Sequence, residues 1–393
     1  PFPAVCGLVC PRFCEEACSR GDVDAPVAID EVKKFLAQRE LDPATRVIPK
    51  MLNTTGKPFT NKIAVIGGGP SGLSCAYYLA VKGYPVTVFE KAERPGGMLT
   101  RVIPTFRLEK DVVEAEIDVL RALGVEFRCG VEVGKDVTIS SLREEGYEAF
   151  YLAAGAWRSV RLGAAGEDKD GVWDGLSFLE AVNTENKPSV GKSVAVIGGG
   201  NTAMDCARAA LRLGAESVTV VYRRTRGEMP ASDEEIAEAE SEGVKFKFLA
   251  SPVEVLGDES VTGLKLSLMK LGAADSSGRA KPEPTGETED IHVDCVITAL
   301  GQRVELGNML KGTAVRFNKN GTVVVDKITL QTDEGDIFAG GDVVTGASFA
   351  IDAIAAGKEA SISIHRFVHE GQSLVLGRTV KEYLSLDKDA ARV

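Results

Sequence analysis

No stretch of the 393-residue sequence approaches the roughly 20 consecutive apolar residues that a membrane-spanning helix needs. Basic residues are fewer than acidic ones, 46 against 57, and the formal net charge is −11. No basic patch stands out, so we expect neither a membrane nor a nucleic acid as a partner. Histidine is scarce, and His292, His365 and His369 follow no metal-ligand spacing.

The eight cysteines include no Cys-x-x-Cys pair. Disulfide reductases of the thioredoxin- or glutathione-reductase type need a redox dithiol, so the spacing argues against that class. No secretory signal is recognisable, and a disulfide framework fits a large acidic chain of this kind poorly. We therefore expect free thiols and a cytoplasmic location.

What the sequence does contain is a long internal repeat. The stretch AVIGGGPSGLSCAYYLAVKGYPVTVFEK at 64–91 recurs, changed at key positions, as AVIGGGNTAMDCARAALRLGAESVTVVYRR at 195–224. Each copy has the pattern of an apolar strand, a glycine turn, a helix and a second strand, which is the opening βαβ unit of a Rossmann fold. The repeat predicts two dinucleotide sites. Cys75 and Cys206, at equivalent helix positions, should pack in the core.

In the first copy, Gly67, Gly69 and Gly72 form the G-x-G-x-x-G fingerprint. These glycines allow a tight turn, a close approach of the backbone to a pyrophosphate and packing of the helix on the strand. We expect a strand at 63–66 and a helix at 71–82. Glu90 ends the next strand, where a carboxylate can accept hydrogen bonds from ribose hydroxyls.

The second copy keeps Gly198 and Gly200 and has Ala203 in place of the third glycine, a variant that the fingerprint allows. Its second strand ends without an acid, and Arg223 and Arg224 follow at once. Arginine forks onto phosphate oxygens that a carboxylate would repel, so this site should prefer NADPH, with NADH still allowed. The alternative is that both arginines are ordinary surface residues.

Four of the eight cysteines, Cys6, Cys10, Cys14 and Cys18, lie within 13 residues in C-x3-C-x3-C-x3-C spacing. Pro11 argues against a single unbroken helix there. Such a concentration of thiols has three interpretations: a disulfide framework, a structural zinc site or an iron–sulfur cluster. Zinc ligands usually come in C-x2-C pairs, so the run fits zinc only loosely.

Further motifs continue along the chain, among them EKAERPGGMLTRVIPTFRLEKDVVEAEIDVLRALGVEF, YRRTRGEMPA and FAGGDVVTG. Together with the CGLVCP run, PVAI, GGGPSGL and GGGNTAMD, their order is similar to the small subunit of NADPH-dependent glutamate synthase. The same module resembles the N-terminal half of dihydropyrimidine dehydrogenase and the large subunit of NADH-dependent ferredoxin:NADP oxidoreductase. The similarity covers roughly residues 1–370. It implies an oxidoreductase in which NAD(P)H reduces FAD, and FAD passes electrons singly to iron–sulfur clusters.

The resemblance also implies which residues bind each cofactor. For FAD these are the first fingerprint, the glycine pair after it, and the GGD segment with the helix of about 15 residues that follows it: Gly67, Gly69, Pro70, Ser71, Gly72, Glu90, Lys91, Gly97, Met98, Leu99, Gly155, Gly341, Asp342, Ala350 and Ile351. For NADPH they are Gly198, Gly200, Asn201, Thr202, Ala203, Arg223, Arg224 and Gly301. One [4Fe-4S] cluster is assigned to the four N-terminal cysteines. No side chain is assigned a catalytic role, because hydride chemistry belongs to the cofactors.

The sequence departs from the family pattern in its N-terminal part. Family members commonly bind a second [4Fe-4S] cluster with cysteines upstream of the run, and they tend to place Gln or Glu as a ligand where Lys33 stands here. A lysine ammonium has no lone pair to offer a metal, so we expect one cluster.

The same resemblance implies partner redox subunits or domains, and hence a hetero-oligomer or a segment of a longer polypeptide. It leaves the final electron acceptor open, electron bifurcation included. Two alternatives from other classes remain. One is a stand-alone FAD-dependent NAD(P)H oxidase or disulfide reductase, and the other is a structural zinc-binding interaction subunit.

The predicted architecture is α/β, with two Rossmann-like domains, the second inserted in the first, preceded by a small helical iron–sulfur domain. The expected boundaries are 1–60 for the cluster domain, 61–164 with 304–370 for the FAD domain, 165–303 for the NAD(P)H domain and 371–393 for a C-terminal tail or the start of a further segment. YLAAGAW at 151–157 and VITALGQ at 296–302 should be the crossovers. The polar residues 271–290 should form a surface hairpin.

Overall fold

The computed structural model describes residues 1–53, 56–185, 187–274 and 279–380, so the predicted tail lies outside the described residues beyond position 380. Contacts divide the chain into two compact units. Unit 1 comprises Pro1–Thr100, Thr105–Ala156 and the chain from Arg303 onward, and unit 2 comprises Arg101–Pro104 and Trp157–Gln302. The chain passes between them at β5 (Arg158–Ser159) and β14 (Gln302–Arg303).

Unit 1 is built on a five-stranded parallel sheet. The strands are β1 (Lys62–Ile66), β2 (Val86–Glu90), β3 (Glu126–Cys129), β4 (Tyr147–Leu152) and β15 (Ile337–Ala339), in the order β15-β4-β1-β2-β3. Ile66 pairs with Phe89 on one side and with Leu152 on the other. The central strands are apolar and buried on both faces, as parallel strands covered by helices must be. The helices are α4 (Pro70–Lys82), α5 (Met98–Arg101), α6 (Lys110–Ala122), α7 (Ile139–Glu144), α11 (Asp342–Thr345) and α12 (Ala350–Phe367).

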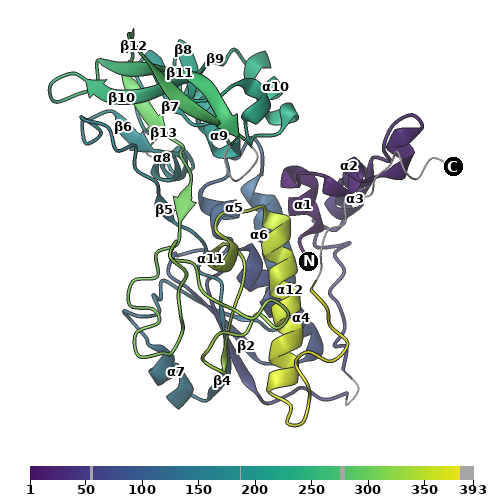
Figure 1. Cartoon of the computed structure of the whole chain (residues 1–393). Coiled ribbons are helices and arrows are strands. Elements are labelled where there is room, and N and C mark those ends of the chain that lie inside the picture. Colours follow the sequence, from purple (N-terminus) through teal and green to yellow (C-terminus); the bar gives the residue numbers. More distant parts are fainter. Residues whose placement is uncertain (54–55, 186, 275–278, 381–393) are drawn as a thin grey trace. The chain divides into compact units, whose positions relative to one another are not determined.

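Helix α12 packs closely on α4, and Figure 1 shows the two running side by side. At the crossing Gly357 faces the backbone of α4, and the Ser74 hydroxyl donates to the carbonyl oxygen of Ile354 at 2.7 Å. The helix predicted after Asp342 is present as α12, and the short helix α11 lies between Asp342 and its start. Gly346, with φ at 79°, ends the short α11, and the long helix begins only at Ala350.

The N-terminal segment of unit 1 is helical and broken as Pro11 predicts. Its helices are α1 (Pro3–Val9), α2 (Phe13–Glu16), the 3₁₀ helix η1 (Ser19–Asp22) and α3 (Ile29–Arg39). Cys10 is extended between α1 and α2, with ψ at 138°. Helix α1 packs against α3, α6 and α12, so the cysteine-rich segment rests on the flavin-fingerprint unit.

Unit 2 repeats the sheet of unit 1. Its strands are β6 (Val172–Asp174), β7 (Ser193–Ile197), β8 (Ser217–Tyr222), β9 (Lys245–Phe248) and β13 (Cys295–Thr298), in the order β6-β13-β7-β8-β9. Helices α8 (Gly175–Val182), α9 (Asn201–Arg212) and α10 (Asp233–Ser241), with the 3₁₀ helix η2 (Arg226–Glu228), complete this layer. From the fingerprint strand onward, β1 or β7, the first four strands have the same order in both units, whereas the edge strand β15 comes last in unit 1 and the edge strand β6 comes first in unit 2. The two Rossmann-like sheets that the sequence predicts are therefore present.

A second, antiparallel sheet of unit 2 contains the predicted surface hairpin. It consists of β10 (Ala250–Leu256), β11 (Gly263–Ala274) and β12 (Ala280–His292), in that order. Residues 275–278, between β11 and β12, lie outside the described residues. Among the helices in the described part of the chain, none is long and apolar enough to cross a membrane.

A histidine pair near the C-terminal end of α12 makes unit 1 sensitive to acid. The Tyr84 hydroxyl lies 2.7 Å from Nδ1 of His365 and 3.1 Å from Nδ1 of His369, and Phe59 stacks on the tyrosine ring. Burial, with the positive charges of Lys82, His369 and Arg366, lowers the pKa of His365 from 6.5 to about 4. The neutral ring therefore stabilises the fold fully above pH 6.5, and this stability is lost as the pH falls toward 4.

We expect His365→Gln to flatten the acid slope of the melting temperature between these two pH values. The effect should be about 1–2 kcal/mol, less than for full burial because the ring is partly exposed. Thermal melts across this range measure it. His292→Gln is the matched control, because the His292 side chain is 77% exposed. Equal slopes for both variants and the wild type would contradict the assignment.

Candidate cofactor sites

The first glycine turn lies at the carboxyl end of β1, between β1 and β4, where the strand order of the sheet reverses. Gly67 has φ at 108°, and a Cβ atom there would overlap the carbonyl oxygen of Ala153. A Cβ at Gly72 would overlap the carbonyl oxygen of Gly67. Gly69 and Pro70 begin α4, whose first turn receives no side-chain cap from the described residues. The exposed amides of such a helix start suit a pyrophosphate.

Glu90 is held at the end of β2 beside this turn. Its carboxylate accepts hydrogen bonds from the backbone N–H groups of Gly68 at 2.7 Å and Ala92 at 2.8 Å, and the residue is only 7% exposed. The turn and the carboxylate are thus fixed together, in the arrangement that the fingerprint predicts for binding a ribose next to a pyrophosphate. Lys91 follows, with its side chain exposed.

The glycine pair after β2 folds back on the turn. The N–H of Gly96 donates to the carbonyl oxygen of Gly68 at 2.7 Å. Gly97 has φ at 56°, and a Cβ there would lie 2.9 Å from Cα of Gly69. Met98 and Leu99 then begin α5. The close backbone approach expected from the sequence is therefore present, and it is made to the fingerprint itself.

The GGD segment reaches the same place from the far end of the chain. Gly341 has φ at 72°, and a Cβ there would lie 2.9 Å from Cβ of Ser71. The Ser71 hydroxyl in turn lies 2.7 Å from the hydroxyl of Tyr151, a contact that the sequence motifs did not indicate. Burial raises the pKa of Asp342 from 3.8 to about 6, against the N–H of Ser348, which donates to its carboxylate.

The contacts thus join four of the predicted FAD segments: the fingerprint, Glu90, the glycine pair and Gly341. The remaining predicted residues lie at the ends of neighbouring elements of unit 1. Gly155, with φ at 75°, follows β4, and Ala350 and Ile351 begin α12.

The glycine turn of unit 2 reproduces the first one. Gly198 has φ at 143°, and a Cβ there would overlap the carbonyl oxygen of Ala299. A Cβ at Gly67 would overlap the carbonyl oxygen of Ala153 in the same way. Gly200 precedes α9, whose first turn receives no side-chain cap from the described residues, and Asn201 and Thr202 begin the helix. Ala203 is fully buried, so a methyl group fits where the first copy needs glycine. Gly301, with φ at 111°, lies in the crossover after β13.

The RTRGEMPA loop packs on this second turn. The N–H of Ala231 donates to the carbonyl oxygen of Gly199 at 3.0 Å, and the N–H of Ser232 donates to the side chain of Asn201 at 3.3 Å. The Tyr222 hydroxyl donates to the carbonyl oxygen of Glu228 and ties the loop to the end of β8. The loop therefore borders the second glycine turn.

The two arginines after β8 are not equivalent. Arg224 is only 4% exposed, and its Nε donates to the carbonyl oxygen of Ala280 on β12 at 2.7 Å. Arg223 has an exposed side chain. The sequence motif does not distinguish the two guanidinium groups. Because consecutive residues at a strand end point to opposite faces, only one of the two is directed to solvent here.

Two of the four N-terminal cysteines lie on the short helices α1 and α2, and the other two follow these helices. Cys6 is buried in α1, Cys14 is exposed on α2, and Cys10 and Cys18 are half-buried. Burial raises the pKa of the Cys6 thiol to about 11, and the charge of Lys33, which is paired with the buried Asp30, lowers it. In the described residues no three Cys, His, Asp or Glu side chains converge to hold a metal ion. The donor set itself, four cysteine thiols, suits an iron–sulfur cluster chemically.

Three of the other four cysteines are buried in the core. Cys75 and Cys206 are fully buried in α4 and α9, as predicted, and burial raises the pKa of both thiols well above the ordinary value. Burial also raises the pKa of Cys295, to about 12. Protonated, buried thiols of this kind are inert toward disulfide exchange.

Comparisons with known proteins identify the family of this chain and several relatives. Residues 61–357 match the family described as pyridine nucleotide-disulphide oxidoreductase, and residues 1–44 match the 4Fe-4S domain II of dihydropyrimidine dehydrogenase. The chain is 42% identical to the NADP(+)-dependent formate dehydrogenase subunit beta of Moorella thermoacetica, covering 93% of this chain and 55% of that one. It is 37% identical to the glutamate synthase [NADPH] small chain of Escherichia coli K12, covering 92% and 80%.

Among solved structures, Mycobacterium tuberculosis FprA in complex with NADPH has the same fold, with a TM-score of 0.69, 19% identity and coverage of 79% of this chain and 85% of that one. The chain spans just over half the length of the formate dehydrogenase subunit. The matches confirm the resemblance, the fold class and the set of cofactors inferred from the sequence. They do not address which residues bind them.

Proposed function

We propose an electron-input role for this chain, which belongs to the pyridine nucleotide-disulphide oxidoreductase family. It is an FAD- and NAD(P)H-dependent oxidoreductase with an N-terminal 4Fe-4S domain, and its relatives are subunits of multi-subunit redox enzymes. We propose that it takes electrons from NADPH and delivers them to a partner redox subunit. The observation that carries the proposal is the repeated glycine turn, built twice with the same backbone geometry but with different groups at the ends of β2 and β8.

The difference between these strand ends assigns the two nucleotides. At the end of β2 the Glu90 carboxylate is bonded to the glycine turn, where it would receive ribose hydroxyls of FAD and repel a phosphate. At the end of β8 no carboxylate stands in that place, and Arg223 presents an exposed guanidinium group. We propose that Arg223 holds the 2′-phosphate of NADPH, while Arg224 supports the strand end through β12.

When bound, the cofactors supply the chemistry: a hydride from NADPH, two-electron and one-electron steps at FAD, and single-electron acceptance at the cluster. The chain's own residues bind and orient these groups. The turns at Gly67 and Gly198 lead into uncapped helix starts, which are the two proposed pyrophosphate positions. Cys6, Cys10, Cys14 and Cys18 are the proposed cluster ligands. With no Cys-x-x-Cys pair in the sequence, a disulfide-reductase role is not favoured.

We also propose that the chain assembles with partner subunits and is located in the cytoplasm. Relatives named as beta or small subunits support a hetero-oligomer that carries further redox centres. Eight cysteines that form no disulfide in the described structure, together with the proposed thiol-ligated cluster, support a reducing compartment.

Anaerobic reduction with each nucleotide tests the assignment of Arg223. We expect Arg223→Ala to lower the NADPH-over-NADH preference in flavin bleaching by about tenfold or more, because a charge-assisted bond to the phosphate is lost. Flavin reduction by NADH should change little. Arg224→Ala should instead lower thermal stability, since its buried guanidinium is bonded to Ala280. An unchanged preference in Arg223→Ala would contradict the phosphate assignment.

The purified chain tests the function as a whole. We expect a brown-yellow protein that releases FAD on denaturation, contains about four iron per chain and is bleached by NADPH. A colourless protein containing zinc would support the structural alternative. Turnover of NADPH with a small disulfide, without any partner protein, would support the disulfide-reductase alternative.

A further inference from the structure

Helix α6 carries a buried acid on its apolar face. Val113, Glu116, Ile117 and Leu120 follow the i, i+3, i+4, i+7 spacing of a buried stripe, and all four are buried. Glu116 is only 8% exposed. A carboxylate in such a position needs hydrogen-bond donors, because burying an unpaired one is costly.

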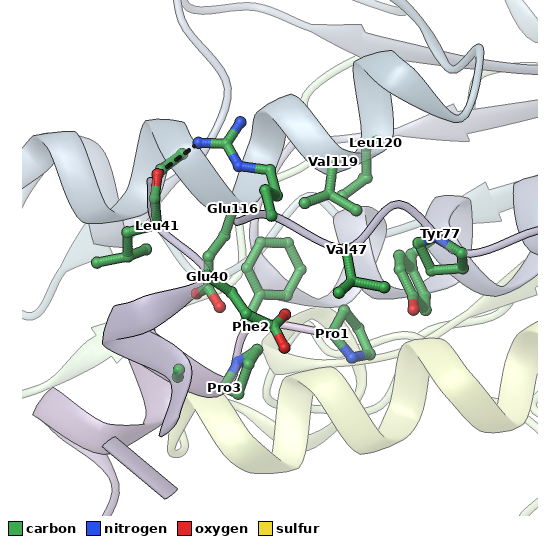
Figure 2. Close-up of a pocket in the computed structure, with 14 residues that line it drawn as sticks. Pro1, Phe2, Pro3, Glu40, Leu41, Val47, Tyr77, Glu116, Val119 and Leu120 are labelled. Atoms are coloured by element: carbon green, nitrogen blue, oxygen red, sulfur yellow. Dashed lines mark hydrogen bonds between the residues drawn. The ribbon is translucent and has the colours of Figure 1, made fainter. Parts of the chain in front are cut away.

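The donors come from the cysteine-rich segment. The backbone N–H groups of Ala4 and Val5 donate to the two oxygens of Glu116, each at 3.0 Å. These amides lie in the first turn of α1, which receives no side-chain cap from its own N-cap residue, Phe2. Figure 2 shows Glu116 extending from α6 toward Phe2 and Pro3 in a pocket of about 260 Å³. Glu116 is therefore the cap of α1, although it lies more than one hundred residues away.

The cap fixes the helix that carries the first cysteine. Cys6 follows Val5 directly and is buried in α1, and the N–H of Cys10 donates to the carbonyl oxygen of Cys6 at 3.0 Å. A displacement of the α1 start would thus move both cysteines. Burial raises the pKa of Glu116 to about 7, against the two N–H donors, which lower it.

A second contact ties the same segment to the start of α12. Phe13, between Cys10 and Cys14, meets Phe349 edge to face, with ring centroids 5.4 Å apart. Phe349 immediately precedes α12, whose first residues are among those proposed for FAD. The cysteine segment is thus attached to the rest of unit 1 at two places: the buried carboxylate on α6 and the aromatic pair at the start of α12.

We propose that Glu116 is a positioning residue for electron transfer between the flavin and the cluster. This rests on the proposed function. NADPH gives a hydride to FAD and leaves as NADP⁺. One electron then leaves the reduced flavin, which is oxidised by one electron, and enters the cluster, which is reduced by one. The rate of that step depends on the separation of the two centres, and the Glu116 cap sets the position of α1 on the flavin-binding unit.

Glu116→Gln tests the proposal with little change in volume. The amide keeps one acceptor but turns an NH₂ donor toward an N–H donor, so one of the two bonds to α1 is lost. Glu114→Gln is the matched control, because Glu114 lies on the same helix, is half exposed and pairs with Arg121 rather than with α1. Both variants are prepared as full-length, cofactor-loaded protein. Stopped-flow absorbance separates flavin bleaching by NADPH from cluster reduction, at about pH 8, where the carboxylate is ionised.

In Glu116→Gln we expect NADPH to bleach the flavin at the wild-type rate, while the cluster is reduced about tenfold more slowly or to a smaller extent. Glu114→Gln should match the wild type in both steps. Loss of iron with retention of FAD would also support the positioning role. Equal cluster-reduction rates and unchanged cluster EPR spectra in Glu116→Gln would overturn it. If Glu116→Gln does not fold, Glu116→Asp decides, since a shortened carboxylate should slow only cluster reduction. A wild-type protein without a NADPH-reducible cluster would instead overturn the proposed function.

Discussion

Cys14→Ser should yield a folded flavoprotein without its iron–sulfur cluster. Cys14 is exposed on the short helix α2, so the substitution removes a thiolate without opening a cavity. A serine hydroxyl is not ionised at neutral pH and replaces a thiolate ligand poorly. We expect iron to fall from about four per chain to nearly none, and electron delivery to a partner acceptor to fall by about 100-fold or more. Bleaching of the flavin by NADPH should persist.

Iron analysis, the absorbance spectrum and single-turnover bleaching measure these three effects separately. Cys129→Ser is the matched control, since Cys129 is also a partly exposed free thiol but lies at the end of β3. Cys6→Ser would be less informative, because Cys6 is buried in α1 and its replacement also disturbs packing. Full iron content in Cys14→Ser would remove this residue from the proposed ligand set.

The glycine turns show what could be predicted from the sequence. At Gly67 and Gly198 the chain turns with positive φ against a carbonyl group just after the neighbouring strand of the sheet, and no other residue type fits. That requirement is local, so the motif alone predicted the strand, turn and helix in both units. The short helix α11 and the break at Gly346 before α12 were not predicted, because they are set by loop geometry that the apolar pattern does not reveal.

Other features depend on contacts between distant segments. Arg223 and Arg224 look alike in the sequence, and only pairing of Arg224 with the β12 backbone separates them. Glu116 did carry a signal, an acid within the apolar stripe of α6, but its partners are amides of residues that no pattern connects to it. Periodicity therefore reveals that such an acid is buried, whereas its role follows only from the fold.

Gly357→Ala should prevent unit 1 from binding FAD. A Cβ at this position would overlap the carbonyl oxygen of Ser71 and approach the amide nitrogen of Cys75 to 2.8 Å. Both are backbone atoms of α4, so no side-chain rotation relieves the clash, and α12 must move away from α4. We expect a destabilisation of about 3 kcal/mol or more, toward the upper end of the cost of overpacking a core.

The displacement reaches the proposed FAD site because both helices begin there. The first turn of α4 contains Ser71, which touches Gly341, and α12 begins at Ala350. Separating the helices therefore pulls the fingerprint away from the GGD segment, and the purified variant should contain little FAD. The flavin-to-protein ratio and the melting temperature measure the effect. Gly335→Ala is the control, since no described atom lies within 4 Å of an added Cβ there. Gly357→Ala with full flavin content and a melting temperature within about 2 °C of the wild type would show that α12 does not hold the site together.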